Sequence, residues 1–286
     1  MKNWEDLRFL LAIADAGSLS GAARHLQVDH ATVSRRLNAL EENLKTRLVI
    51  RAARSCHLTV LGQQVLEIAR QMEATAFTID RLALAAQHPI SGNVSISAPP
   101  VLATHLLAKC LNKFHQCHPQ IQLSIASQAA RISLSRQEAD IALRLVRPAD
   151  NNDVARKLGN MPFALYASKD YVHQSDPDSW KFIGYDKQFS GMPHAGWITS
   201  TAGIRPIVCS VSDISSQLEA AKSGVGVASL PRFMGDSDPE LVSLPFDGEI
   251  YSPEIWLAIH ADLRHSPLMR IVLDFIANAV TEHIVT

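Results

Sequence analysis

The sequence lacks the long apolar run that a membrane helix requires. No stretch approaches the ~20 consecutive apolar residues of a membrane span, and the opening segment MKNWEDLRFLLAIADAG carries acidic residues within its apolar part. We therefore expect neither a membrane anchor nor a signal peptide. Only four cysteines are present, and they are too scattered for a disulfide framework. Together these absences predict a protein of the reducing cytoplasm.

The chain also carries almost no net charge. A formal net charge of −1 would argue against a nucleic-acid binder if the charges were evenly spread. They are not, because the segment from residue 45 to residue 54 holds Lys45, Arg47, Arg51 and Arg54 without an acidic residue. Three further basic residues precede it: Arg24, Arg35 and Arg36. Such a local basic surface attracts phosphate in a salt-dependent way even on a near-neutral protein.

Motifs of catalysis, cofactor binding and metal binding are missing as well. There is no G-x-S-x-G nucleophile elbow, and Gly224-x-Gly226 lacks the third glycine of a dinucleotide fingerprint. Cys110, His115, Cys117 and His118 have the composition of a metal cluster, but on a helix they fall on different sides. We therefore expect no enzyme activity, no cofactor and no metal.

What is present is a pair of short helices joined by a tight turn, from Ser18 to Leu44. With Val33 at zero on a helical wheel, the residues Leu37, Leu40 and Leu44 fall within roughly 40° of it and form a buried stripe. Ser18 and Asp29 stand where helix N-caps are wanted. An earlier helix is expected from Asn3 to Ala16, with Asn3 as its cap and Gly17 at its end.

The opposite face of the second helix is suited to contact with DNA. Ala31, Ser34, Arg35 and Asn38 lie between about 100° and 200° on the same wheel. Small residues let a helix approach the major groove closely, while hydroxyl, amide and guanidinium groups reach bases and phosphates. An ordinary helical pair with a solvated polar face would show the same pattern.

The stretch VDHATVSRRLNALEENLKTRL, followed by RAARSCHLT, resembles the winged helix-turn-helix of LysR-type transcriptional regulators, whose usual pattern is close to A-A-x-x-L-x-V-S-Q-x-A-V-S-x-x-I-x-x-L-E. The matching positions are Ala22, Ala23, Leu26, Val28, Val33, Ser34, Leu37, Leu40 and Glu41. Asp29 and His30 replace the usual Ser and Gln, Lys45 stands where Gly is common, and Ala53 and Ser55 replace wing glycines. The resemblance implies that DNA is contacted by Ser20, Asp29, His30, Ala31, Thr32, Ser34, Arg35, Asn38, Arg51 and Arg54.

A long helix is predicted next, from a cap at Thr59 to about Gln87. Apolar and small residues recur along it at steps of three and four: Leu61, Val65, Ile68, Met72, Thr75, Ile79, Leu82 and Ala86. This heptad-like seam needs a partner helix, most simply from a second copy of the chain. Val65, Ile68, Met72 and Ile79 are its expected core. The alternative is a long helix packed on its own domain.

After the break at 88–93 the pattern changes to short strands alternating with helices. It predicts a mainly parallel sheet and then, from about residue 147 to 161, departure into a second α/β lobe. EADIALRLVRP and GVGVASLP resemble the effector-binding half of the same regulators. The fold expected is α/β with an N-terminal all-α winged helix-turn-helix, a long linker helix and a two-lobed periplasmic-binding-protein-like domain. The expected boundaries are 1–58, 59–88 and 89–286, with lobe I at about 90–160 and 267–286 and lobe II at about 161–266.

The same resemblance implies an effector site between the two lobes. Carried onto this chain, its residues are Pro99, Pro100, Gln128, Arg144, Arg147, Thr199, Ser200 and Thr201. Helix N-termini, hydroxyls and an arginine at the crossover would suit an anionic group. Two prolines replace a frequent hydroxyl residue, which makes that wall stiffer and more apolar. Surface ion pairs of Arg144 and Arg147 with Asp140 or Asp150 are the alternative.

The prediction from the sequence is a cytoplasmic transcriptional regulator that binds double-stranded DNA under the control of a small-molecule effector. A homodimer is expected, a homotetramer is plausible in this family, and RNA polymerase is a further candidate partner. A solute-binding protein would lack the basic helical module, and an enzyme that uses the cleft would need a convergent acid and base.

Overall fold

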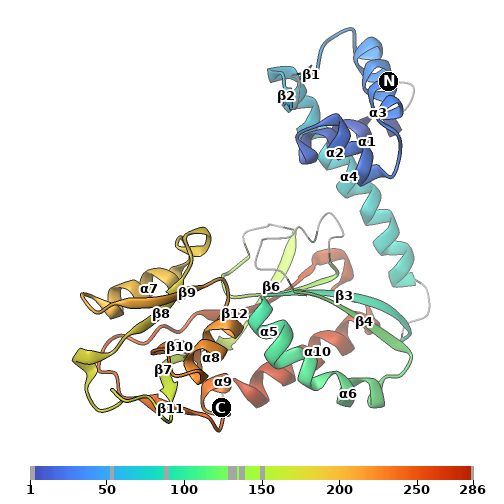
Figure 1. Ribbon diagram of the computed structural model, residues 1–286. Coiled ribbons are helices and arrows are strands. Elements are labelled where there is room, and N and C mark those ends of the chain that lie inside the picture. Colours follow the sequence, from blue (N-terminus) through green and yellow to red (C-terminus); the bar gives the residue numbers. More distant parts are fainter. Residues whose placement is uncertain are drawn as a thin grey trace. The chain divides into compact units, whose positions relative to one another are not determined.

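The computed structural model describes residues 4–51, 55–86, 90–127, 134, 139–148 and 152–284. The chain divides into two compact units, Met1–Arg81 and Leu82–Thr286. The division falls within helix α4 (Val60–Ala86), so each unit contains a part of this helix (Figure 1). The helix predicted at 59–88 is therefore not a separate unit. Asn3, Arg54 and Gln128 lie outside the described residues.

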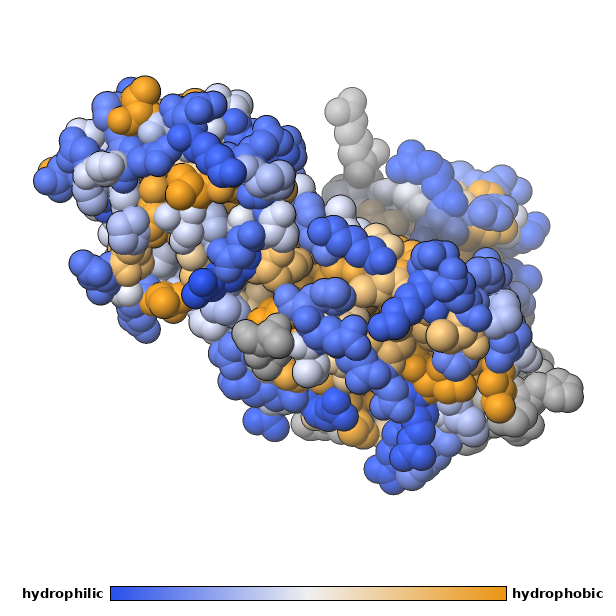
Figure 2. All heavy atoms as spheres, turned by 90° about the horizontal axis from the view of Figure 1, so that it is seen from below, coloured by the Kyte–Doolittle hydropathy of each residue, from blue (hydrophilic) through white to orange (hydrophobic). Residues whose placement is uncertain are grey.

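The surface carries apolar side chains in separate patches. Figure 2 shows these patches between hydrophilic groups on one face of the molecule. Large exposed apolar residues include Ile68 and Ile79 on α4, and Ile207 and Val208 on strand β9 (Ile207–Val211). Apolar groups that recur along one element mark a surface suited to contact with another molecule.

Three helices form the body of the first unit: α1 (Glu5–Ala16), α2 (Leu19–Leu26) and α3 (His30–Leu44). The predicted caps of α2 and α3 are confirmed. The Gly21 N–H donates to Ser18 Oγ (3.1 Å), and the Thr32 N–H donates to Asp29 Oδ1 (2.6 Å). The predicted stripe of α3 is also confirmed, because Val33, Leu37 and Leu40 are completely buried in the core of this unit.

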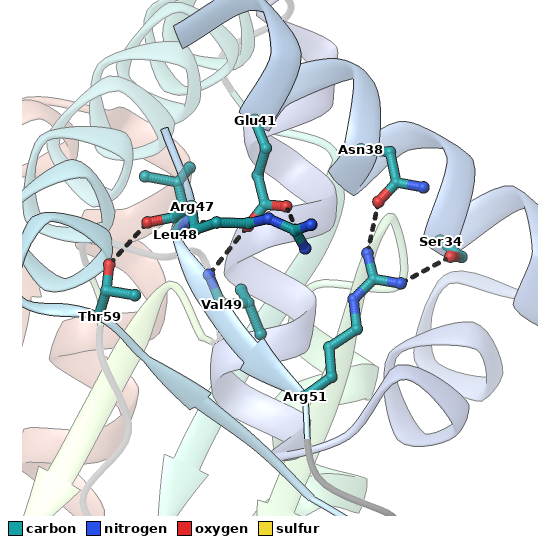
Figure 3. A network of polar contacts seen from close by, with 8 residues as sticks. All are labelled: Ser34, Asn38, Glu41, Arg47, Leu48, Val49, Arg51 and Thr59. Atoms are coloured by element: carbon teal, nitrogen blue, oxygen red, sulfur yellow. Dashed lines mark hydrogen bonds and ion pairs between the residues drawn. The ribbon is translucent and has the colours of Figure 1, made fainter. Parts of the chain in front are cut away.

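A two-stranded antiparallel wing follows α3, formed by β1 (Val49–Arg51) and β2 (Cys56–Leu58). The buried carboxylate of Glu41 ties it to the helix, because Glu41 Oε1 accepts hydrogen bonds from the N–H groups of Leu48 (2.7 Å) and Val49 (3.0 Å) (Figure 3). Arg47 lies 3.8 Å from the other carboxylate oxygen. The wing therefore begins at a defined position beside α3.

Helix α4 begins at the predicted cap, since the Gly62 N–H donates to Thr59 Oγ1 (2.9 Å). One side of its first turns packs on the first unit through Leu66 and Ala69. Val65, predicted as part of the seam, also packs partly against this core. On the other side, the seam residues Leu61, Ile68, Met72 and Ile79 are exposed in the single chain.

The second unit contains a five-stranded sheet in the order β4-β3-β5-β12-β6. Its strands are β3 (Gly92–Ala98), β4 (Ile121–Ser127), β5 (Ile141–Arg144), β6 (Asp153–Asn160) and β12 (Glu254–His260). Strand β3 runs parallel to β4 and β5, whereas β12 is antiparallel to β5 and β6. The sheet is therefore mixed and not mainly parallel as predicted.

One boundary predicted for the lobes agrees with the sheet and one does not. The end of lobe I predicted near residue 160 agrees, because Asp153–Asn160 is the edge strand β6 of the first sheet, so the chain leaves this sheet after β6 and not at residue 147. The strand Glu254–His260, which falls within the range predicted for lobe II, lies in the first sheet between β5 and β6. This error arises from strand pairing between segments far apart in the sequence.

Helices cover one face of this sheet (Figure 1). A continuous helical segment runs through α5 (Pro100–Leu102), a π-helical turn (Ala103–Leu107) and α6 (Ala108–Cys117). It begins at Pro100. Helix α10 (Pro267–His283) packs beside it, and Ser266 caps its start.

The second lobe holds two smaller sheets. Strands β7 (Phe163–Ser168), β10 (Ala228–Pro231) and β11 (Leu241–Leu244) are antiparallel in the order β10-β7-β11, and β8 (Phe182–Tyr185) is parallel to β9. The helices are α7 (Pro193–Ala202), α8 (Ile214–Lys222) and α9 (Arg232–Gly235). Short 3-10 turns lie at Pro177–Ser179, Lys187–Phe189 and Ala261–Leu263.

Helix α3 ends on a residue that offers a test of backbone strain. Lys45 adopts a left-handed conformation with φ of 52°, which costs a side-chain-bearing residue more than glycine. We expect Lys45→Gly to raise the free energy of unfolding of the first unit by about 0.5–1 kcal/mol. Lys45→Ala keeps the Cβ atom and should bring no such gain in calorimetric unfolding. Equal effects of the two variants would contradict the explanation.

The link between Glu41 and the wing offers a second test. Glu41→Ala leaves two buried N–H groups without their acceptor, so we expect local opening at residues 48–49 to become easier by about 2–3 kcal/mol. Hydrogen-exchange mass spectrometry of peptides that cover the wing measures this change. Glu42→Ala removes an exposed carboxylate from the same turn and should change protection by less than about 0.5 kcal/mol. Similar protection in the two variants would show that Glu41 does not hold the wing.

Candidate functional sites

Helix α3 presents a polar face next to its buried stripe. His30, Ala31, Arg35 and Asn38 are exposed, and Thr32 and Ser34 are partly exposed. Asp29 is committed to its cap, where the hydrogen bond from the Thr32 backbone N–H is the main cause of its lowered pKa. The carboxylate thus fixes the start of α3 and keeps its negative charge there.

The wing reaches this face through Arg51. Its guanidinium donates to Ser34 Oγ (3.1 Å) and to Asn38 Oδ1 (2.6 Å), so that three predicted DNA contacts form one cluster (Figure 3). Polar side chains of α3 and a cation of the wing thereby share one exposed surface. Ser20 is exposed at the start of α2, and Arg54 lies outside the described residues.

The basic residues near this surface do not all have the same role. Arg36, counted among them in the sequence, pairs with the buried Asp6 (3.2 Å), lies 3.9 Å from Glu5 and rests over the Phe9 ring. It therefore ties α3 to α1. Arg35 is exposed one residue earlier, on the polar face. If the polar face of α3 were only solvated, the hydrogen bonds from Arg51 of the wing to Ser34 and Asn38 would have no functional explanation.

The second unit contains a cavity of about 560 Å³. Most of its lining is apolar, with prolines, aliphatic side chains, Phe189 and Met192, and its charged or hydrogen-bonding side chains are few. These polar residues are Arg144, Arg147, Asp153, Tyr185, His194, Ser212, Asp213, Ser215 and Tyr251. The size and the mixture are typical of a site for a small molecule.

The cavity includes part of the predicted effector set. Pro99, Pro100, Arg144 and Arg147 line it. Thr199, Ser200 and Thr201, also predicted for this site, lie in the last turns of α7 and are not among the residues that line the cavity. The helix start that lines the cavity is Met192–His194, where proline occupies the first helical position.

Arg144 is held rigidly at the end of β5. Its Nη1 donates to the carbonyl oxygens of Leu143 (2.6 Å) and Ser97 (3.0 Å), and its Nη2 donates to Ser97 Oγ (3.1 Å). Burial lowers its pKa, which the nearby Asp153 partly offsets. The alternative ion pair with Asp140 is wrong, since the Asp140 carboxylate accepts from the backbone and hydroxyl of Ser95. The Asp150 alternative falls outside the described residues.

Arg147 takes a different position beyond the end of β5. Its guanidinium lies 5.4 Å from the centre of the Trp256 ring, at a distance typical of a cation–π contact. Asp150, its other proposed ion partner, is not among the described residues.

An aromatic wall that the sequence did not predict completes the cavity. His194 Nδ1 lies 3.0 Å from the Tyr185 hydroxyl, and His194 Nε2 lies 2.9 Å from Ser229 Oγ. The Tyr251 ring stacks on the imidazole at 5.0 Å. Burial lowers the pKa of His194 to about 3 and raises the pKa values of both tyrosines. The wall is therefore uncharged near neutral pH.

No sequence signal could have assembled this wall, because its residues come from β8, α7, β10 and the segment before β12. The one local hint is the Met192-Pro193 pair, which marks the true start of α7. Among the described residues, no three of the His, Cys, Asp and Glu side chains are grouped so that they could hold a metal ion. No helix in the described part of the chain is long and apolar enough to cross a membrane.

Two family models match the chain. Residues 4–63 match the bacterial regulatory helix-turn-helix protein, lysR family, and residues 87–281 match the LysR substrate binding domain. Among curated proteins, the Mau operon transcriptional activator of Paracoccus denitrificans is 30% identical, with 98% of this chain and 97% of the relative covered. The regulator CrgA of Neisseria meningitidis is 29% identical, with 82% of both chains covered.

A solved structure agrees with this result. The structure of CrgA from Neisseria meningitidis has a TM-score of 0.56 and 26% sequence identity, and the match covers 97% of this chain and 99% of that one. The helix-turn-helix with its wing, the two-lobed α/β unit and both matched models therefore agree. The chain belongs to the LysR family and is a transcriptional regulator with an N-terminal DNA-binding domain and a C-terminal effector-binding domain.

Proposed function

We propose that this regulator reads its operator with the polar face of α3 and with Arg51 of the wing. The observation that carries this proposal is the cluster of Arg51, Ser34 and Asn38, which joins wing and helix in one exposed surface. Hydroxyl, amide and guanidinium groups can reach base edges, while the arginines also meet phosphates. Asp29 and His30 at the start of α3 are then positions that distinguish its operator from those of relatives with Ser and Gln.

The reading unit is a homodimer paired through α4. Ile68 is 58% exposed and Ile79 is 66% exposed in the single chain, and both lie on the seam with Leu61 and Met72. Burial of such a seam against a second copy removes apolar surface from water. Two copies of α3 would then read two half-sites of a near-symmetric operator. A pair of dimers, forming a tetramer, extends the same arrangement.

The cavity of the second unit is the effector site, and its occupant shifts the protein between states that hold DNA differently. Arg144 and Arg147 supply its cationic groups. We assign the cavity no catalytic role, because both nitrogens of His194 are engaged by Tyr185 and Ser229 and neither is placed to act as a base. The regulator acts in the cytoplasm, and RNA polymerase is its further partner.

The double substitution Ser34→Ala with Arg35→Ala tests the reading face. Each lost base contact costs about 1–3 kcal/mol, so we expect affinity for the chain's own upstream DNA to fall by roughly 30-fold or more, toward the non-specific level. An electrophoretic shift titrated with salt measures this loss, since phosphate contacts weaken steeply as salt rises. Arg156→Ala, which removes an exposed arginine of β6, should leave binding unchanged. Retained specific binding in the double variant would count against α3 as the reader.

Ile68→Glu tests the seam. A carboxylate buried between two helices is unfavourable, so we expect monomers or aggregates in light scattering after size exclusion. Gln63→Glu adds the same charge about 140° away around α4 and should leave the dimer intact. A normal dimer of Ile68→Glu would show that the interface lies elsewhere.

A further inference from the structure

The cavity of the second unit is larger and more apolar than a small polar metabolite needs. It encloses about 560 Å³, and its walls include Val101, Leu145, Phe189, Met192 and Ile214. Pro99 and Pro100 add apolar surface and carry no backbone N–H. A ligand rich in hydroxyl or ammonium groups would lose its hydrogen bonds to water without gaining enough partners here.

The cavity favours one negative charge at its arginine end. Arg144 lies near Asp153, and Arg147 lies near Glu254, whose carboxylate is paired with Lys157 at 2.7 Å. These five groups leave a single positive charge in excess.

Asp213, the other acidic residue that lines the cavity, does not cancel this preference for an anion. The Asp213 carboxylate accepts from the Ser216 N–H (2.8 Å), from Ser216 Oγ (2.8 Å) and from Ser212 Oγ (3.2 Å). It thereby caps α8 and offsets the positive end of that helix. The arginine end is thus the anion-selective part of the lining.

The remaining wall is built for a flat apolar body. The rings of Tyr185, His194 and Tyr251 stand together, with His194 and Tyr251 stacked at 20° between their planes. All three are neutral near pH 7, as the direction of their pKa values requires. Phe189 and the thioether of Met192 border the same space, and both groups contact aromatic rings favourably.

We propose that the effector is an aryl carboxylate, whose anionic group lies at Arg144 and Arg147 and whose ring lies against Tyr185, Tyr251 and Met192. This inference rests on the proposed function of the cavity as the effector site and names the class of its ligand. Arg144, fixed by Ser97 and Leu143, sets the position of the carboxylate. The cavity volume of about 560 Å³ leaves room for a ring system larger than one phenyl group.

Calorimetric titration of the full-length protein with five compounds tests the class. We expect 2-naphthoate to bind about tenfold tighter than benzoate, because the second ring buries more apolar surface. The neutral 2-naphthamide should bind at least about tenfold weaker than 2-naphthoate, since it lacks the charge-assisted hydrogen bonds. Succinate and L-phenylalanine should bind more weakly than benzoate. The proposal would be overturned if succinate or L-phenylalanine bound more tightly than benzoate, or if 2-naphthamide and 2-naphthoate bound equally well.

A pair of variants locates the anionic end. Arg147→Gln should reduce the preference for 2-naphthoate over 2-naphthamide by about tenfold while binding of the amide changes little. Arg156→Gln, an exposed arginine of β6 that does not line the cavity, should keep the full preference. An unchanged preference in Arg147→Gln would refute the placement, and the acid-to-amide ratio of the unaltered protein decides the class if that variant does not fold.

The same preparations separate this inference from the proposed function. Specific DNA binding without binding of any aryl carboxylate would overturn the ligand class and leave the regulator intact. Binding of 2-naphthoate without specific DNA binding would support the ligand class and overturn the proposed reading of an operator. A change in the electrophoretic shift on addition of 2-naphthoate supports both.

Discussion

The carboxylate of Glu41 joins the wing to α3 in the surface that we propose reads DNA. It is buried near the end of α3 and accepts hydrogen bonds from two N–H groups at the start of the wing. The wing therefore cannot move freely relative to α3, and this fixed position lets Arg51 donate hydrogen bonds to Ser34 and Asn38. Without such an acceptor the two backbone groups would be buried without partners, which is costly.

The same requirement recurs at the start of other elements. Ser18, Asp29, Thr59 and Asp213 each accept a backbone N–H from the first turn of a helix. In the effector-binding domain, Asp140 satisfies both the backbone and the hydroxyl of Ser95 on β3. Short polar side chains thus set where helices and strands begin. The positions of the functional groups follow from these starting points.

These local rules explain which parts of the protein could be predicted from the sequence. The caps Ser18 and Asp29 and the stripe of Val33, Leu37 and Leu40 depend on neighbours in the chain, and the sequence shows them directly. Strand β12 was assigned to the wrong lobe because it pairs with β6, about a hundred residues earlier in the chain. No periodicity records which distant strand completes a sheet.

The cavity proposed as the effector site shows the same division. All of the effector residues named from the sequence came from the resemblance, and Pro99, Pro100, Arg144 and Arg147 among them lie at or just beyond the ends of β3 and β5, where they line the cavity. Thr199 to Thr201 lie in the last turns of α7 and do not line it. His194 was missed although it follows Pro193 at the true helix start. Its role becomes visible only when Tyr185, Ser229 and Tyr251 meet around it.

The enclosed imidazole has a consequence for how the protein responds to acidity. A histidine whose pKa lies near 3 stays neutral until the medium is far more acidic than any growing cell tolerates. The phenols beside it keep their protons because burial raises their pKa values, so the same cause holds all three rings neutral. A fall in pH inside a living cell would therefore leave the aromatic wall of this cavity uncharged.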